Sequence, residues 1–574
     1  MKRKLLLSAG IVLLATIIWG FSEDLFQVSK NLDVFASLYK EVNINYVDDI
    51  NSTKMIKTGV DAMLDGLDPY TNFVPESEIE DYKLNYISTQ YGGVGAGIFS
   101  RGNNVYVSEV FEGYPAQKAD IRAGDQIVKI NNIDLNSKNS DDVSLLLKGS
   151  KGEIVKLLVK RGNNAPVEKD LVRDEIKQPN VSYYGMVSGN MGYIKLDRFL
   201  ENSGDEVTNA LIALKKNNPN GIILDLRSNG GGILQEAVKI VNLFVSKGTE
   251  IVAQRGKIKE KDITYTTTST PLDATIPLVV LVNAHSASAS EIVAGSLQDL
   301  DRAVIIGQRS FGKGLVQQTF PLPYNSLVKI TIAKYYIPSG RCIQALDYSH
   351  RKDDGSVVKV ADSLMHEFKT ADGRSVYDGG GIYPDLFITQ EHFAAITQSL
   401  LGKLLVFDYA TYYREKHDKI ANADEFRLSD ADYADFTKFL ADKNYSYTSP
   451  YEKLLDDLKT ETAKEKQYDK VQPEYDALKT KLMESKKNDL QVHKDEIKQL
   501  LENEIVSRYY YQKGRYQSNF KYDDELAQAV KTMQDKNLLT AILKGEGNYK
   551  VIGKPGVAIA TVKADANDDD NDSQ

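Results

Sequence analysis

A group of serines suited to nucleophilic chemistry lies directly after an apolar run. Ser286, Ser288 and Ser290 alternate with alanine, after the run Leu278–Val282 and before Glu291. The apolar run is typical of a buried strand, and the small and apolar residues after Glu291 favour a packed helix. A hydroxyl at such a strand-to-helix turn lies at the positive end of the helix. Backbone N–H groups without helical partners can stabilise an oxyanion there. The turn therefore fits a serine nucleophile.

The same residues also have a purely structural interpretation. Ser288 and Glu291 have the spacing of a capping box, in which the serine only binds the first amides of the helix. Helix caps are far commoner than nucleophiles. This stretch alone does not decide between the two, so a second element is needed.

The second element is a lysine between two glycines, in the segment Gly307–Gly314, GQRSFGKG. The segment contains most of a phosphate-binding loop, G-x-x-x-x-G-K. However, Gly314 stands where such a loop has the Ser or Thr that holds the metal ion. Pro321 also follows within a few residues, so the loop does not open the helix that nucleotide binding requires. The pattern argues against a nucleotide site.

Lys313 is instead a candidate general base for Ser288. Burial removes the water that stabilises an ammonium charge and so lowers the pKa of a lysine. Flanking glycines let the backbone bring Nζ against another side chain. A serine–lysine pair is a recognised arrangement for nucleophilic catalysis, and its activity should rise with pH. His285 is the alternative base, but it lies too close to Ser288 in sequence to reach the hydroxyl easily.

A run of three glycines marks another candidate part of the site. The predicted strand Ile222–Leu226 leads into DLRSNGGG at 225–232, and a helix is predicted over Leu234–Phe244. Glycines in this position let the backbone approach a ligand or a reacting carbonyl. The alternative is a tight turn without a ligand.

Residues 86–165 resemble a PDZ domain, most clearly in the run Gly124-Asp-Gln-Ile-x-x-Ile-Asn. A PDZ domain binds a peptide as an added strand and holds its C-terminal carboxylate with the backbone amides of a glycine-rich loop. Gly93, Val94 and Gly95 match that loop. The alternative is a glycine-rich hairpin turn that binds nothing.

The motifs taken together resemble the C-terminal processing peptidases, also called tail-specific proteases. The resemblance covers residues 35–390 and rests on the following segments: DLRSNGGG at 225–232, SASASEI at 286–292, QD at 298–299, RA at 302–303, GKGxxQ at 312–317, PSGR at 338–341, TADGR at 370–374 and GGGIYPD at 379–385. It implies that Ser288 is the nucleophile, that Lys313 is the general base and that Gln317 orients the lysine.

The resemblance also assigns the supporting residues. It implies that the amides of Ala289 and Gly232 form the oxyanion hole. Ser286, Ser290 and Glu291 are then interpreted as turn and capping residues. Two positions depart from the family pattern, His285 in place of a small residue and Cys342 in place of a serine. Neither belongs to the serine–lysine pair.

The resemblance implies a serine endopeptidase that recognises protein C-termini through its PDZ domain and cleaves near them, without a metal or cofactor. The expected partners are proteins or peptides with free C-termini, and the family also suggests a homodimer. Two alternatives stay open. One is a catalytically inactive PDZ adaptor that binds protein tails, and the other is a protease that degrades whole proteins.

Composition limits the partners further. The chain has 574 residues, 71 Lys and Arg against 80 Asp and Glu, and a net charge of −9. Apart from the short basic segment at the N-terminus, the basic residues form no runs, so nucleic acid is not expected as a partner. A single cysteine allows no internal disulfide and no Cys/His metal spacing.

The N-terminus indicates the compartment. The basic residues at 1–4 precede an uncharged apolar run at 5–21. This pattern is typical of a secretion signal or a short membrane anchor. We therefore expect the chain in a bacterial cell envelope, on the periplasmic side of the inner membrane.

The expected fold is an α+β multidomain chain, with an α/β core of the crotonase/ClpP-like type that the resemblance implies. The expected parts are a signal or anchor at 1–24, a helical region at 25–85, a PDZ domain at 86–165, a Ser–Lys protease core at 166–392, a helical domain at 393–550 and an acidic disordered tail at 551–574.

Overall fold

The computed structural model describes residues 26–79, 82–83, 90–136, 138–352, 356–389, 392–556 and 561–562. The chain divides into two compact units. One runs to Ser77 and includes Gln317–Thr331, and the other contains Glu78–Val316 and Ile332–Gln574. The expected signal or anchor at 1–24 lies outside the described residues, as does the end of the expected acidic tail from 563 onward.

A seven-stranded sheet forms the core of the second unit. Its strands, in spatial order, are β10 (Val181–Val187), β11 (Met191–Leu196), β12 (Ile222–Asp225), β15 (Leu278–Val282), β16 (Val304–Gly307), β23 (Leu386–Ile388) and β24 (Thr561–Val562). β10 is antiparallel to β11, and every later pair is parallel. Parallel strands covered on both faces appear as continuous apolar runs, as Leu278–Val282 does. The expected α/β core is confirmed.

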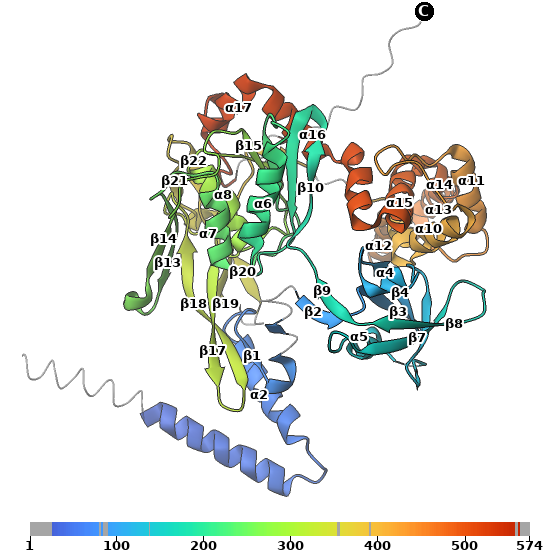
Figure 1. Cartoon of the computed structure of the whole chain (residues 1–574), viewed down its shortest axis with the longest axis horizontal. Coiled ribbons are helices and arrows are strands. Elements are labelled where there is room, and N and C mark those ends of the chain that lie inside the picture. The colour runs from blue at the N-terminus through green and yellow to red at the C-terminus, as the bar shows by residue number, and fades with distance from the viewer. Residues whose placement is uncertain are drawn as a thin grey trace, which may run out of the picture. The chain divides into compact units, whose positions relative to one another are not determined.

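Helices cover both faces of this sheet. One face packs against α6 (Ser203–Lys215), α7 (Leu234–Asn242) and α8 (Ala289–Asp299). The other face packs against α16 (Asp524–Gln534) and α17 (Lys536–Leu543). In Figure 1 these last two helices lie beside the sheet. The end of the region expected as a helical domain thus supplies one layer of the core.

The region that resembles a PDZ domain contains a six-stranded antiparallel sheet around its own apolar cluster. The strands are β3 (Ala96–Arg101), β4 (Asn104–Val110), β5 (Gln126–Ile130), β6 (Ile133–Asp134), β7 (Ile154–Lys160) and β8 (Val167–Val172). Its helices are α4 (Pro115–Lys118) and α5 (Ser140–Leu147), and a separate pair joins β2 (Gln90–Gly93) to β9 (Asp174–Lys177). β3 is an edge strand, because β4 is its only neighbour in the described sheet.

Smaller strands surround the core. β13 (Glu250–Gly256) pairs with β14 (Ile263–Thr266), and the end of β18 (Ser326–Tyr336) pairs with β13. Two hairpins follow, β19 (Leu346–Arg351) with β20 (Val357–Lys359), and β21 (Glu367–Lys369) with β22 (Ser375–Tyr377).

The first unit is small and largely helical. It contains a helix over 26–45, α2 (Ser52–Asp65) and β1 (Asn72–Val74). β1 pairs with the beginning of β18, which forms a hairpin with β17 (Leu315–Leu322).

The expected helical region after the core is confirmed. It contains α9 (Ala395–Gly402), α10 (Leu405–Lys416), α11 (Asp430–Phe439), α12 (Pro450–Lys464), α13 (Tyr468–Lys486), α14 (Asp489–Val492) and α15 (Lys494–Asn519). Most of these helices share one apolar cluster. Across the described ranges, no helix combines the length and apolarity that a bilayer crossing requires.

Candidate active site

Ser288 lies at the turn between β15 and α8, as the sequence predicts. It is the N-cap of α8, with a φ of 56° and a ψ of −114°. A positive φ is uncommon for a residue with a side chain and costs free energy. Such strain is concentrated at functional sites, where the surrounding structure enforces it. The backbone conformation of Ser288 therefore supports a functional role beyond helix capping.

The amide of Ala289 is available to an oxyanion. In this turn, the amide of Ser288 donates to Glu291, and that of Ser290 donates to the carbonyl of Ala287. The Ala289 amide donates to no acceptor among the described residues. Ala289 is the first residue of α8, and the N–H groups of a first turn point away from the helix without helical partners. This geometry fits the predicted oxyanion donor.

The glycine run lies directly against Ser288. Gly231 has a φ of 92°, and a Cβ on it would lie 2.7 Å from the Ser288 Cβ and 2.8 Å from the Ala289 nitrogen. The Gly231 amide donates to Asn229 Oδ1. Across the described part of the chain, the Gly232 amide has no acceptor. Gly232 as an oxyanion donor stays a prediction, and the structure adds Gly231 as the residue whose missing side chain permits the close approach.

Glu291 connects the serine turn to the lysine loop. Its Oε2 accepts the amide of Ser288 and the amide of Lys313, each at 2.9 Å. Its Oε1 accepts the Ser310 hydroxyl at 2.5 Å and the Gly312 amide at 2.7 Å. The amide nitrogens of Ser288 and Lys313 are therefore within about 6 Å of each other, since each is 2.9 Å from one oxygen. The sequence predicts Glu291 as a capping residue, which accounts only for its contact with Ser288.

Tyr335 makes the same connection through the carbonyls. Its hydroxyl lies 3.2 Å from the carbonyl oxygen of Ser288 and also donates to the carbonyl of Lys313. Tyr335 is buried on β18. Two side chains thus tie the backbones of Ser288 and Lys313 together. Tyr335 is a residue that sequence reasoning missed, and nothing in its sequence context indicates it.

Lys313 lies on the segment between β16 and β17, and Gln317 follows four residues later. Lys313 is half-buried in the loop, and Gln317 is on β17. The side chain of Gln317 donates to Thr331 Oγ1 on β18. The orienting role of Gln317 toward the lysine stays a prediction. His285, the alternative base, is exposed, and its amide donates to Asn283 Oδ1.

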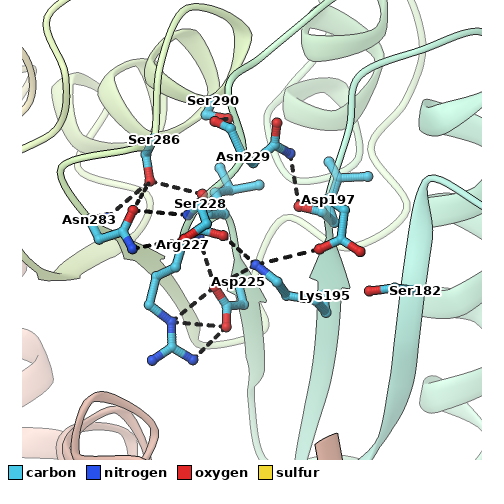
Figure 2. A network of polar contacts seen from close by, with 12 residues as sticks. Ser182, Lys195, Asp197, Asp225, Arg227, Ser228, Asn229, Asn283, Ser286 and Ser290 are labelled. Atoms are coloured by element: carbon cyan, nitrogen blue, oxygen red, sulfur yellow. Dashed lines mark hydrogen bonds and ion pairs between the residues drawn. The ribbon is translucent and has the colours of Figure 1, made fainter. Parts of the chain in front are cut away.

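The other two serines bind the glycine loop. The hydroxyl of Ser286 donates to the carbonyl of Leu226, and that of Ser290 donates to the carbonyl of Asn229, both at 2.8 Å. Figure 2 shows both hydroxyls beside this loop. Both are fully buried. Their hydroxyls hold the loop against the turn, which agrees with the structural role that the sequence indicates.

A network of charged residues lies at the beginning of the glycine loop (Figure 2). Asp225, at the end of β12, accepts hydrogen bonds from Tyr193 and Arg227 and pairs with Lys195. Burial opposes ionisation of Asp225, but the charges of Arg227 and Lys195 prevail and hold the pKa of that carboxyl well below its usual range. Asp225 is therefore an anion that fixes the start of the loop.

The loop that resembles a carboxylate-binding loop lies between β2 and β3. Gly93 ends β2, and the carbonyls of Val94 and Gly95 accept the amides of Ala116 and Phe111. The amides of Val94 and Gly95 themselves find no acceptor within the described residues. The loop therefore presents donors next to β3, the edge strand of the sheet.

No metal site accompanies these residues in the described part of the chain, where no three His, Cys, Asp or Glu side chains gather as metal ligands would.

Three domain families match the sequence. Residues 190–350 match peptidase family S41, and residues 87–160 match the PDZ domain. Residues 396–533 match the C-terminal helical domain of probable PDZ-proteases.

Known proteins are also similar to this chain. The carboxy-terminal-processing protease of Bartonella bacilliformis is 34% identical over 345 residues, which cover 59% of this chain and 78% of that protein. The carboxy-terminal processing protease CtpA of Bacillus subtilis is 29% identical over 409 residues, 69% of this chain and 86% of that protein. Among solved structures, the photosystem II D1 C-terminal processing protease is 29% identical, covering 54% of this chain and 89% of that chain, with a TM-score of 0.31.

The protonation of Glu291 is a testable consequence of its burial. Burial raises the pKa of Glu291 from 4.5 to about 7, although hydrogen bonds from Ser310 and from nearby amides partly oppose the shift. A difference infrared spectrum between the wild type and Glu291→Gln at pH 6 should contain the C=O band of a protonated carboxyl. The band should disappear as the pH rises through about 7.

The sign of the stability effect follows from the same shift. Because the pKa of Glu291 is higher in the folded chain, its contribution to stability is full below its unfolded pKa and is lost as the pH rises through about 7. Absence of the band at pH 6 would show that the carboxyl is already ionised there and would contradict the prediction.

Proposed function

Because the chain belongs to the C-terminal processing proteases of peptidase family S41, which are serine-type endopeptidases, we propose that Ser288 and Lys313 form its catalytic pair. We propose further that it captures protein C-termini through its PDZ domain and cleaves near them. The observation that carries the first proposal is that one buried carboxylate, Glu291, accepts the amides of both residues. A nucleophile and its base must lie within hydrogen-bond reach, and this shared anchor brings their backbones together.

In the proposed mechanism, the neutral amine of Lys313 takes the proton of the Ser288 hydroxyl. The Ser288 Oγ attacks the peptide carbonyl, and the amides of Ala289 and Gly232 stabilise the oxyanion. Lys313 then gives its proton to the leaving amine, which releases the C-terminal fragment. Water hydrolyses the remaining ester with the lysine again as the base.

Substrate capture is proposed for the loop of Gly93, Val94 and Gly95. A free α-carboxylate would accept the available amides of this loop, and the residues before it would pair with the edge strand β3. The helix α5 lies against β3 and would form the other wall of the peptide site. The proposed substrates are proteins of the cell envelope, since the basic and apolar residues at 1–21 have the pattern of a secretion signal or anchor.

Substitution of the pair tests the assignment of nucleophile and base. Ser288→Ala and Lys313→Ala should each lower the rate of cleavage of a peptide with an apolar C-terminus by about a thousandfold or more. The nucleophile cannot react without its base, nor the base without its nucleophile, so the loss of either removes the function of both. His285→Ala should retain activity. Mass spectrometry of the products identifies loss of C-terminal residues. Cleavage by either first variant at the wild-type rate would refute the pair, and loss of activity in His285→Ala would make that histidine the base.

A glycine pair in the loop provides a matched test of the oxyanion hole. Gly231→Ala would place a Cβ 2.6 Å from the Ala287 carbonyl oxygen and 2.8 Å from the Ala289 nitrogen. This displacement of the donor should lower kcat by about a hundredfold or more. Gly230→Ala is the control, because a Cβ at that residue would meet no described atom within 4 Å. Equal activity of the two variants would contradict the proposed geometry.

The free carboxylate of the substrate tests the capture step. A peptide acid should be cleaved with a kcat/KM at least about tenfold higher than the same peptide with a C-terminal amide, because the amide cannot place a charge in the loop. The ratio of kcat/KM between acid and amide should be the same for peptides of different internal sequence. Equal kcat/KM for acid and amide would show that the loop does not recognise the terminus.

A further inference from the structure

The C-terminal helical region supplies a side chain to the loop that precedes the oxyanion hole. Asp523, directly before α16, receives a bidentate ion pair from Arg227, with Nη1 at 2.8 Å from Oδ1 and Nη2 at 2.7 Å from Oδ2. Glu525 adds a contact of 3.1 Å to Nη1. The guanidinium also binds Asp225, which is at the end of β12. Bidentate pairs of this kind fix orientation as well as adding energy.

These groups are shielded from water. The side chains of Asp225 and Asp523 are 2% and 5% exposed, and those of Arg227 and Glu525 are 17% and 19% exposed. An ion pair in such surroundings is screened much less than one at the surface. Removing Asp523 would still leave Asp225 and Glu525 beside the Arg227 charge, but it would take away a bidentate partner. The contact of Asp523 with Arg227 is therefore a strong constraint on the loop.

Arg227 is only a few residues before the glycines that face Ser288. Its carbonyl accepts Lys195 Nζ (Figure 2). The next residue, Ser228, has a φ of 60° and donates its amide to Asn283 Oδ1. Asn229 then donates its side-chain amide to the carbonyl of Leu196. The loop is thus held in a strained path, and the Arg227 side chain anchors its beginning.

Asp523 is itself rigidly placed. Its Oδ1 accepts the amide of Leu526 and caps α16. The buried face of α16 packs against β15 and β16 through side chains that include Leu526, Val530 and Met533. Because Asp523 is fixed relative to the sheet, its ion pair with Arg227 can fix the beginning of the glycine loop relative to the sheet as well.

We propose that Asp523 is a positioning residue for the peptidase reaction, which acts through Arg227 to hold the glycine loop in the conformation that presents the Gly232 amide. The inference rests on the proposed function of Ser288 and the oxyanion hole. It makes the segment after α15 a functional part of the active site, although residues 190–350, which match the peptidase family, end well before it.

The substitution Asp523→Asn separates this role from helix capping. Asparagine caps a helix about as well as aspartate, so Oδ1 can still accept the Leu526 amide. The new NH₂ group would face Arg227 Nη2, which is also a donor. We expect kcat to fall by about 10- to 100-fold with KM changed less than about threefold, the pattern of a lost transition-state interaction. Asp523→Glu, which keeps the charge, should recover part of the loss.

Asp524→Asn is the matched control, because it makes the same chemical change at the next residue, which is exposed. It should have the kcat of the wild type. A double-mutant cycle identifies the route. Arg227→Met combined with Asp523→Asn should lose no more activity than Arg227→Met alone. Wild-type kcat in Asp523→Asn, a change in KM alone, or additive losses in the cycle would overturn the inference.

A readout independent of catalysis distinguishes this inference from the proposed function. Hydrogen exchange in full-length Asp523→Asn should increase in the segment 227–233 and stay unchanged in Asp524→Asn. Unchanged exchange in that segment would overturn the positioning role even in an active enzyme. If the wild type cleaves no peptide, the proposed function fails, while faster exchange would still support Asp523 as the anchor of the loop.

Discussion

A single buried carboxylate connects the two loops on which the candidate site depends. One oxygen of Glu291 accepts the amides of Ser288 and Lys313, and the other accepts the Ser310 hydroxyl and the Gly312 amide. Without this acceptor, four donors would lose their partner, at a cost of about 1–3 kcal/mol for each one left buried and unsatisfied. Tyr335 repeats the connection at the carbonyls. The backbones that carry the candidate nucleophile and base lie on separate loops, but the same two side chains, Glu291 and Tyr335, bind both of them.

The sheet explains why these loops meet. β12 and β15 are parallel neighbours, so the glycine loop and the serine turn both leave the carboxyl edge of the sheet. Ser286 and Ser290 bind the loop to the turn, and Arg227 binds its beginning to Asp523. The second face of the same sheet is covered by α16 and α17. The geometry of the candidate site thus involves side chains from distant parts of the sequence.

The sequence predicts the elements well and the connections between them poorly. Periodicity places the strand Leu278–Val282 and the helix after Ser288 correctly, because both depend on local patterns. For Glu291 the sequence predicts only a helix-capping role, because its spacing from Ser288 indicates that contact and gives no sign of the contacts with the lysine loop. Tyr335 and Asp523 carry no local signal, since their roles arise only when distant segments pack together. The site assignments themselves come from the family resemblance, and all of them stay predictions.

A crystal structure with a peptide boronic acid tests the central claim most directly. Boron should be bonded to Ser288 Oγ, with one boron hydroxyl within hydrogen-bond reach of the amides of Ala289 and Gly232. Lys313 Nζ should lie about 2.6–3.2 Å from Ser288 Oγ. A bond between boron and another residue, or a lysine amine directed away from the serine oxygen, would contradict the account.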